Sequence, residues 1–127
     1  MPSSRAFAAS TTAIGLIALA HAVLTWSLEA TLAFFAGGAA IAFVAEAVVI
    51  NLDWLDHHVG PKVLGVPIYV LFGWTGVVYF SFRVALLAVD GVPAVALGAV
   101  IATTYDILTD HRGVADGHWT YTDDLPG

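Results

Sequence analysis

The sequence predicts an all-α integral membrane protein with four transmembrane helices, chiefly because its few charges are so unevenly spread. Of the 127 residues, 59% are hydrophobic and 11% are charged. No Asp, Glu, Lys or Arg occurs within 6–28 or within 63–82. A hydrocarbon core roughly 30 Å thick requires about 20 apolar helical residues, so both stretches are long enough to cross a bilayer. A soluble domain of this size could not bury so much apolar surface.

Turn signals divide the chain into its four helices. We expect helices at about 6–28, 30–51, 66–88 and 92–110. Glu29, close to Trp26, marks a tight interfacial turn, and the polar segment 51–62 is a long hinge. Asp90 and Gly91 form the last turn, with Pro93 in the first turn of the fourth helix, where its missing N–H does no harm. Residues 1–110 are therefore the transmembrane domain, and 111–127 are a polar tail without a further helix.

The basic residues predict the orientation of the helices. With a cytoplasmic N-terminus, Arg5, Lys62 and Arg112 all fall inside, whereas the outer turns carry Glu29 and Asp90 and no basic residue. This bias satisfies the positive-inside rule. The sequence thus predicts a multi-pass protein of the cell membrane with both termini and the tail in the cytoplasm.

Small residues predict which helices pack closely. The range 37–42 is rich in Gly and Ala, and so is 98–102. Such residues let two backbones approach in a membrane, so we expect the second and fourth helices to lie side by side. Arg83 is expected to pair with Asp90 or Glu29, and His21 to be a hydrogen-bonded packing residue.

Composition excludes several classes of function. The chain has no cysteine, which removes disulfides and thiolate chemistry. Its net charge of -6 comes from ten acidic against four basic residues, which argues against nucleic-acid binding and also suits a high-salt organism. No lysine lies within a predicted span, which excludes a retinal Schiff base.

Four acidic residues are the candidate catalytic groups. Glu46 and Asp106 lie inside apolar segments, where an ionisable residue is costly and points to function. Asp53 would share a face with Glu46 if the second helix continued, and Asp110 follows Asp106 by one turn. The ends of these helices and the surrounding lipid disfavour an anion, which favours the protonated form that a general acid needs. The plain alternative is that these groups only lock helix packing.

Histidines and aromatic residues surround these acids in the sequence. His57 and His58 are expected to be loop residues that can handle protons, and we predict no metal site because adjacent histidines rarely point the same way. Aromatic side chains near the hinge and in later segments are candidates for an apolar substrate slot. They are Trp54, Tyr69, Phe72, Trp74, Tyr105 and Trp119.

Three short blocks carry a resemblance to a known family. Glu46 lies in a helix that precedes the hinge, Gly65-Val66-Pro67 is followed by Trp74, and the spaced pair Asp106 and Asp110 is followed by Gly117 and Trp119. Over about residues 43–122 the chain resembles the membrane proteins of carotenoid biosynthesis that include bisanhydrobacterioruberin-type hydratases. It departs from them in length, being a short form, and in having His111 after the second aspartate.

The resemblance implies a function and its partners. The protein would hydrate, or only bind, the acyclic isoprenoid end group of a C40 or C50 carotenoid without a cofactor. Membrane lipid, the isoprenoid and a second copy or larger membrane complex are the implied partners. Two alternatives stay open: a non-catalytic accessory subunit of a membrane complex, and a small proton-coupled transporter.

Overall fold

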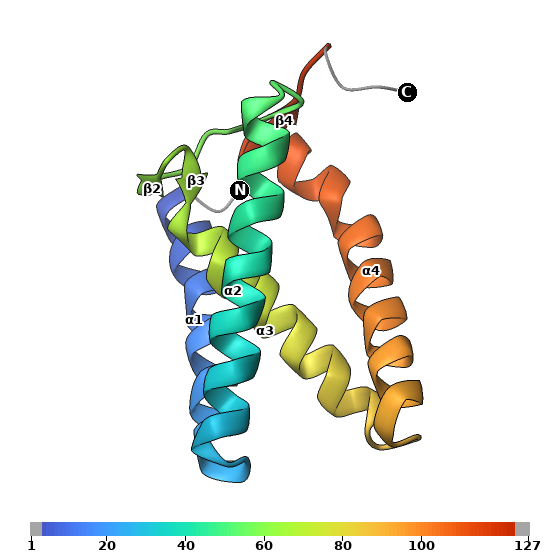
Figure 1. Cartoon of the computed structure of the whole chain (residues 1–127). Coiled ribbons are helices and arrows are strands. Elements are labelled where there is room, and N and C mark those ends of the chain that lie inside the picture. The colour runs from blue at the N-terminus through green and yellow to red at the C-terminus, as the bar shows by residue number, and fades with distance from the viewer. Residues whose placement is uncertain (1–3, 124–127) are drawn as a thin grey trace.

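Four long helices dominate the computed structural model, which describes residues 4–123 (Figure 1). The helices are α1 (Ser4–Thr25), α2 (Leu28–Asn51), α3 (Ile68–Ala85) and α4 (Gly91–Ala115). The strands are β1 (Leu55–His57), β2 (Lys62–Val63), β3 (Val66–Pro67) and β4 (Trp119–Tyr121). By length and composition, all four helices are able to span a membrane, which agrees with the predicted helix number and multi-pass class.

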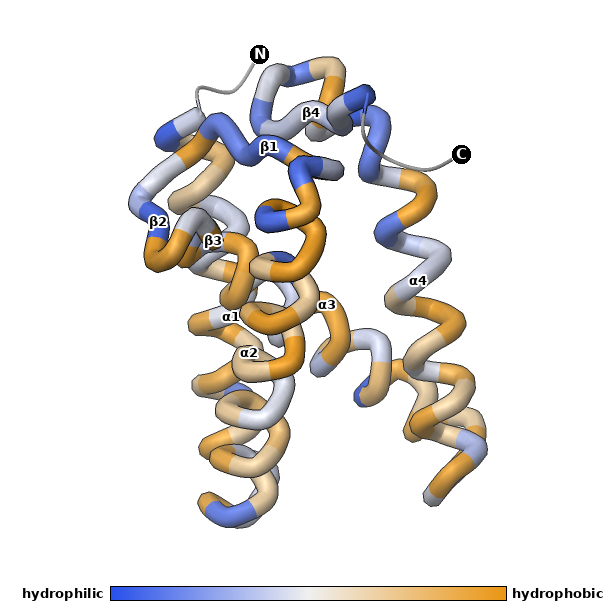
Figure 2. Tube along the Cα trace, turned by 45° about the horizontal axis from the view of Figure 1, so that its top comes forward, coloured by the Kyte–Doolittle hydropathy of each residue, from blue (hydrophilic) through white to orange (hydrophobic). Residues whose placement is uncertain are grey.

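The two ends of the helical bundle differ in structure. All four strands lie at one end, called here the strand end, where hydrophilic residues gather (Figure 2). The opposite end, called here the turn end, contains only the α1–α2 and α3–α4 connections. At the first of these, the hydroxyl oxygen of Ser27 caps α2 by accepting the backbone N–H of Ala30 at 3.1 Å. The cap satisfies one of the N–H groups that a helix start leaves unpaired.

α3 is the central helix and packs against each of the other three. Its closest approach is to α1, where a Cβ on Gly15 would lie 2.5 Å from the carbonyl oxygen of Phe72. The expectation that the second and fourth helices lie side by side is wrong, because α3 occupies the position between them (Figure 1). Gly98 of α4 lies against Phe82 of α3, and Gly38 of α2 lies nearest Thr75 of α3. The small residues do permit close packing, but with the central helix.

Aromatic packing fills the turn end. Tyr79 of α3 is fully buried, and its hydroxyl lies 2.6 Å from Nδ1 of His21, which confirms His21 as a hydrogen-bonded packing residue. Arg83 does not form the expected pair with Glu29 or Asp90. Its guanidinium lies over the rings of Trp26 and Tyr79 at 5.3 and 5.8 Å, because the last turn of α3 places the side chain beside the aromatic cluster.

At the strand end, the segment after α4 folds back on the hinge. β4 pairs antiparallel with β1, so that His57 is opposite Trp119. α4 continues beyond the predicted end at residue 110, as far as Ala115, and Gly117 then reverses the chain with φ 81°. The predicted tail is therefore partly helix and partly strand; its last residues, 124–127, lie outside the described residues.

Candidate functional site

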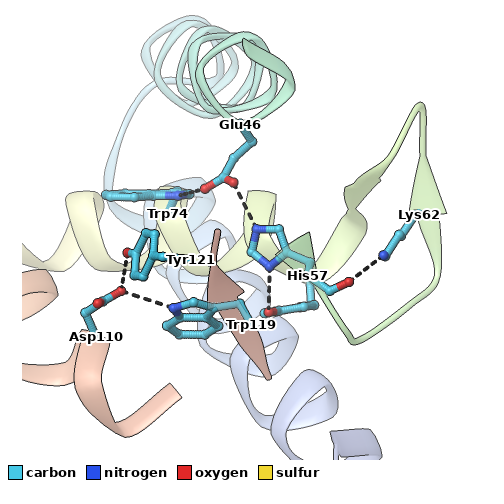
Figure 3. A network of polar contacts seen from close by, with 8 residues as sticks. Glu46, His57, Lys62, Trp74, Asp110, Trp119 and Tyr121 are labelled. Atoms are coloured by element: carbon cyan, nitrogen blue, oxygen red, sulfur yellow. Dashed lines mark hydrogen bonds and ion pairs between the residues drawn. The ribbon is translucent and has the colours of Figure 1, made fainter. Parts of the chain in front are cut away.

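Glu46 lies in the last part of α2, and both of its carboxylate oxygens have partners. Its Oε2 lies 3.0 Å from Nε2 of His57, and the indole N–H of Trp74 donates to its Oε1 at 3.1 Å (Figure 3). The side chain of Glu46 is 12% exposed and that of His57 is 5% exposed. Groups from the hinge and from α3 therefore hold one carboxylate of α2 in a position largely removed from solvent.

The alternation of strand β1 brings His57 to Glu46. Leu55 is buried, Asp56 is exposed and His57 is buried, as the two-residue period of a strand requires. The hydroxyl of Tyr69 lies 3.5 Å from Nδ1 of His57. When this hydroxyl donates to Nδ1, Nε2 donates its proton to a Glu46 carboxylate. In the other tautomer Nδ1 donates to the hydroxyl, and Nε2 accepts the proton of a protonated Glu46. The imidazole therefore connects a phenol to a carboxylate through its two nitrogens.

Asp110 of α4 is held by two donors from β4. The indole N–H of Trp119 and the hydroxyl of Tyr121 both donate to its Oδ1, at 3.1 and 2.7 Å. The Trp119 ring lies so close to Gly113 that a Cβ there would overlap it. Burial first, and then the hydrogen bond to Asp110 with nearby carboxylate charge, raises the pKa of the Tyr121 phenol. The phenol therefore remains protonated and able to donate at neutral pH.

Three of the four predicted acids lie at the strand end: Glu46 on α2, and Asp106 and Asp110 on α4. Asp106 is exposed one turn before Asp110, and its carboxylate experiences the negative charge of both Asp110 and Glu46. Asp53 is not on the same helix face, because α2 ends two residues earlier and Asp53 adopts φ 59° in the turn that follows. It is exposed, and its backbone carbonyl accepts the hydroxyl of Thr122.

The six predicted aromatic residues divide into two groups. Three contact the polar groups of the site: Tyr69 at His57, Trp74 at Glu46 and Trp119 at Asp110. The other three lie elsewhere: Phe72 packs against Gly15 of α1, Trp54 is half-buried in the turn after α2, and Tyr105 is half-exposed on α4. The site thus draws its aromatic side chains from α3 and β4.

Sequence alone does not separate His57 from His58, and it gives Tyr121 no role. The strand pairing separates the two histidines: His57 points to Glu46, whereas Nε2 of the exposed His58 lies 2.9 Å from the hydroxyl of Thr120. In the structure, the buried–exposed–buried alternation at 55–57 places His57 on the buried face of β1. Tyr121 joins the site only through the long-range pairing of β4 with β1, which no local pattern shows.

Neither a metal cluster nor a known relative accounts for the site. Among residues 4–123, no group of three or more His, Asp or Glu side chains could hold a metal ion. No family model, no curated protein and no solved structure matches the chain. The resemblance to carotenoid hydratases thus stays a prediction, and a functional assignment depends on the chemistry of the residues above.

The cluster is suited to moving a proton between the polar strand end and the apolar helices. The imidazole of His57 has two nitrogens that can each give or take a proton, and it contacts Glu46 directly. Asp106 and Asp110 lie across from this pair on α4 and supply further carboxylates. Carboxyl, imidazole and phenol groups in hydrogen-bond reach are the usual equipment for general acid–base chemistry.

Proposed function

We propose that this protein is a cofactor-free membrane hydratase that adds water across the terminal carbon–carbon double bond of an acyclic isoprenoid, with a carotenoid as the substrate class. Glu46 is the proton donor, and His57 exchanges protons with it. Asp110, with Asp106 beside it, positions the water. The observation that carries the proposal is a carboxyl group inside a membrane-spanning helix that contacts a titratable imidazole and an indole at once.

The reaction has two steps, and its atoms balance. Glu46 transfers a proton to the less substituted carbon of the trisubstituted alkene, whose π electrons form the new C–H bond and leave a tertiary cation. A water oxygen then bonds to the cationic tertiary carbon. One proton of that water passes to a carboxylate of the cluster and from there returns to Glu46, while the other stays on the product hydroxyl. The net change is the addition of one water, so no redox cofactor is consumed.

The environment of Glu46 supports each step. The indole of Trp74 lies beside the carboxyl group with its N–H edge toward it, and the π face of the same ring would stabilise a developing cation. Asp106 and Tyr121 are exposed on the side toward α4, so a ligand and water can reach the acids from there. The surrounding helices are apolar, as the chain of an isoprenoid substrate requires.

Replacement of Glu46 by Gln tests the proposal. The purified protein in liposomes is given an acyclic carotenoid, and the hydrated product is measured by its mass and by incorporation of oxygen from labelled water. Glu46→Gln keeps an amide that can accept from Trp74 but has no acidic proton, so turnover should fall by about 10²–10⁴-fold. Glu29→Gln, an exposed carboxylate at the turn end, is the matched control and should keep full turnover.

The same assay separates the hydratase from the accessory subunit. The exposed Asp106 in α4 is the observation that favours a subunit, because a carboxylate in a span can bind a polar group of a partner helix. A subunit would show no turnover alone and would copurify with a larger membrane protein. Full turnover by the Glu46→Gln variant would remove Glu46 from the mechanism.

A further inference from the structure

Arg83 at the turn end has an unusual environment for an arginine. Its side chain is half-buried over the rings of Trp26 and Tyr79, and its Nη1 donates to the hydroxyl of Thr25 at 3.3 Å. Within the described residues 4–123, no carboxylate forms an ion pair with it. A guanidinium has five N–H donors in a planar fork that matches a phosphate or carboxylate. Most of that donor capacity is available to a ligand.

A groove shares the side chain of Trp26 with this guanidinium. Its volume is about 550 Å³, and it lies between the α1–α2 turn and the last part of α3. Its walls are Trp26, Ser27, Ala30, Ala33, Phe34 and Phe82. Trp26 is shared: it forms part of the groove wall and also lies under Arg83. The charged guanidinium of Arg83 and the apolar groove therefore both contact the indole ring of Trp26.

The position of the two features determines which molecule fits them. When the four helices span a membrane, the turn end lies at one membrane–water interface. Arg and Trp are typical residues of such an interface. A membrane lipid has its anionic phosphate at the same depth and its hydrocarbon chains directly below. A free anion would use the guanidinium but leave the groove unfilled, and a purely apolar molecule would leave the guanidinium unpaired.

We infer that the turn end holds one anionic membrane lipid, with its headgroup phosphate on Arg83 and a hydrocarbon chain in the groove beside Trp26 and Phe34. The charge match comes from the guanidinium without a carboxylate partner, and the apolar match comes from the aromatic walls. This site lies at the opposite end of the bundle from Glu46 and does not depend on the proposed hydratase activity. Its occupation would clamp the α1–α2 turn to α3.

Native mass spectrometry of the full chain in detergent tests this inference. Phosphatidylglycerol is the anionic probe, phosphatidylcholine the zwitterionic one, and inorganic phosphate the free anion. One phosphatidylglycerol should bind with at least about tenfold higher affinity than phosphatidylcholine, because Arg supplies a charge-assisted phosphate contact. Arg83→Gln should remove this preference, whereas Arg83→Lys should keep part of it because the charge remains.

Two further variants make the result independent of folding defects at position 83. Arg5→Gln removes a positive charge from the strand end and should leave the lipid preference unchanged. Ala33→Phe fills the groove from the exposed side of α2 without touching Arg83, and should weaken lipid binding by about tenfold. Unchanged preference in both Arg83→Gln and Ala33→Phe would overturn the inference. Inorganic phosphate that displaced the lipid at equal concentration would also overturn it, since the groove would then contribute nothing.

Discussion

Each end of the bundle contains one histidine in contact with one buried tyrosine, and the two pairs differ in what else they touch. At the turn end, His21 contacts Tyr79 at 2.6 Å, and the tyrosine ring lies under the guanidinium of Arg83. At the strand end, His57 contacts Tyr69 at 3.5 Å and also contacts the carboxylate of Glu46 at 3.0 Å. The first pair ties α1 to α3. The second pair connects an acid of α2 to the hinge, which is the contact that the proposed proton transfer requires.

Replacing each histidine by alanine tests whether the two histidine–tyrosine pairs differ in role, and it is expected to give the largest effect. His57→Ala removes the proton partner of Glu46, so hydration of the carotenoid should fall by about a hundredfold. His21→Ala removes a packing hydrogen bond and should cost about 0.5–1.5 kcal/mol of unfolding free energy with turnover retained. Turnover and unfolding in detergent are measured on both variants. Equal losses of turnover would show that the two pairs are equivalent and that His57 has no special role.

The close packing of α1 against α3 extends between the two ends of the bundle, and its disruption is expected to give the next largest effect, a loss of stability. Gly15→Leu would force a side chain into the backbone of Phe72, and overpacking of this kind costs typically about 1–3 kcal/mol. Gly37→Leu is the control, because no atom lies within 4 Å of a Cβ built there. Unfolding midpoints in mixed detergent compare the two variants. A destabilised Gly37→Leu protein beside an unaffected Gly15→Leu protein would contradict the central position of α3.

The smallest effect concerns Tyr121, which has no counterpart at the turn end. Because the pKa of its phenol is raised in the folded protein, the folded state keeps this proton at a pH where the unfolded chain has lost it. Its stabilising contribution is therefore complete below the ordinary tyrosine pKa of 10.0 and declines as the pH rises above that value. Tyr121→Phe should abolish this part of the alkaline destabilisation. Phenolate absorbance and unfolding, followed together from neutral to alkaline pH, measure it; identical profiles for both proteins would contradict the contact with Asp110.

Local patterns in the sequence predict the helices and most of the acids, but not the relations between them. Long apolar stretches identify four spans because hydrophobic length is a local property. Glu46 and Asp106 are conspicuous because each interrupts such a stretch, and Asp110 follows Asp106 by one helical turn. Which helix is central depends on how side chains pack between helices. Gly15 and Gly98 both face α3, but nothing in the sequence around them indicates this.

The hinge and the segment after α4 show the same limit. Asp53 adopts a left-handed backbone conformation in the turn after α2. It therefore does not share a helical face with Glu46, although the sequence spacing predicts that it would. His57 contacts Glu46 from β1, and β1 is paired with β4, whose residue opposite His57 is Trp119, more than sixty residues later in the chain. Tyr121 enters through the same pairing. Contacts between residues so far apart in the sequence produce no local sequence pattern, so only the three-dimensional structure shows them.

The pairing of β1 with β4 also determines when the site can come into existence. Glu46 and His57 leave the ribosome well before Trp119 and Tyr121, which donate to Asp110. During synthesis, Asp110 of α4 therefore lacks its two donors until β4 has been made. A chain cut short before Trp119 would contain the four helices yet lack the contacts that hold Asp110.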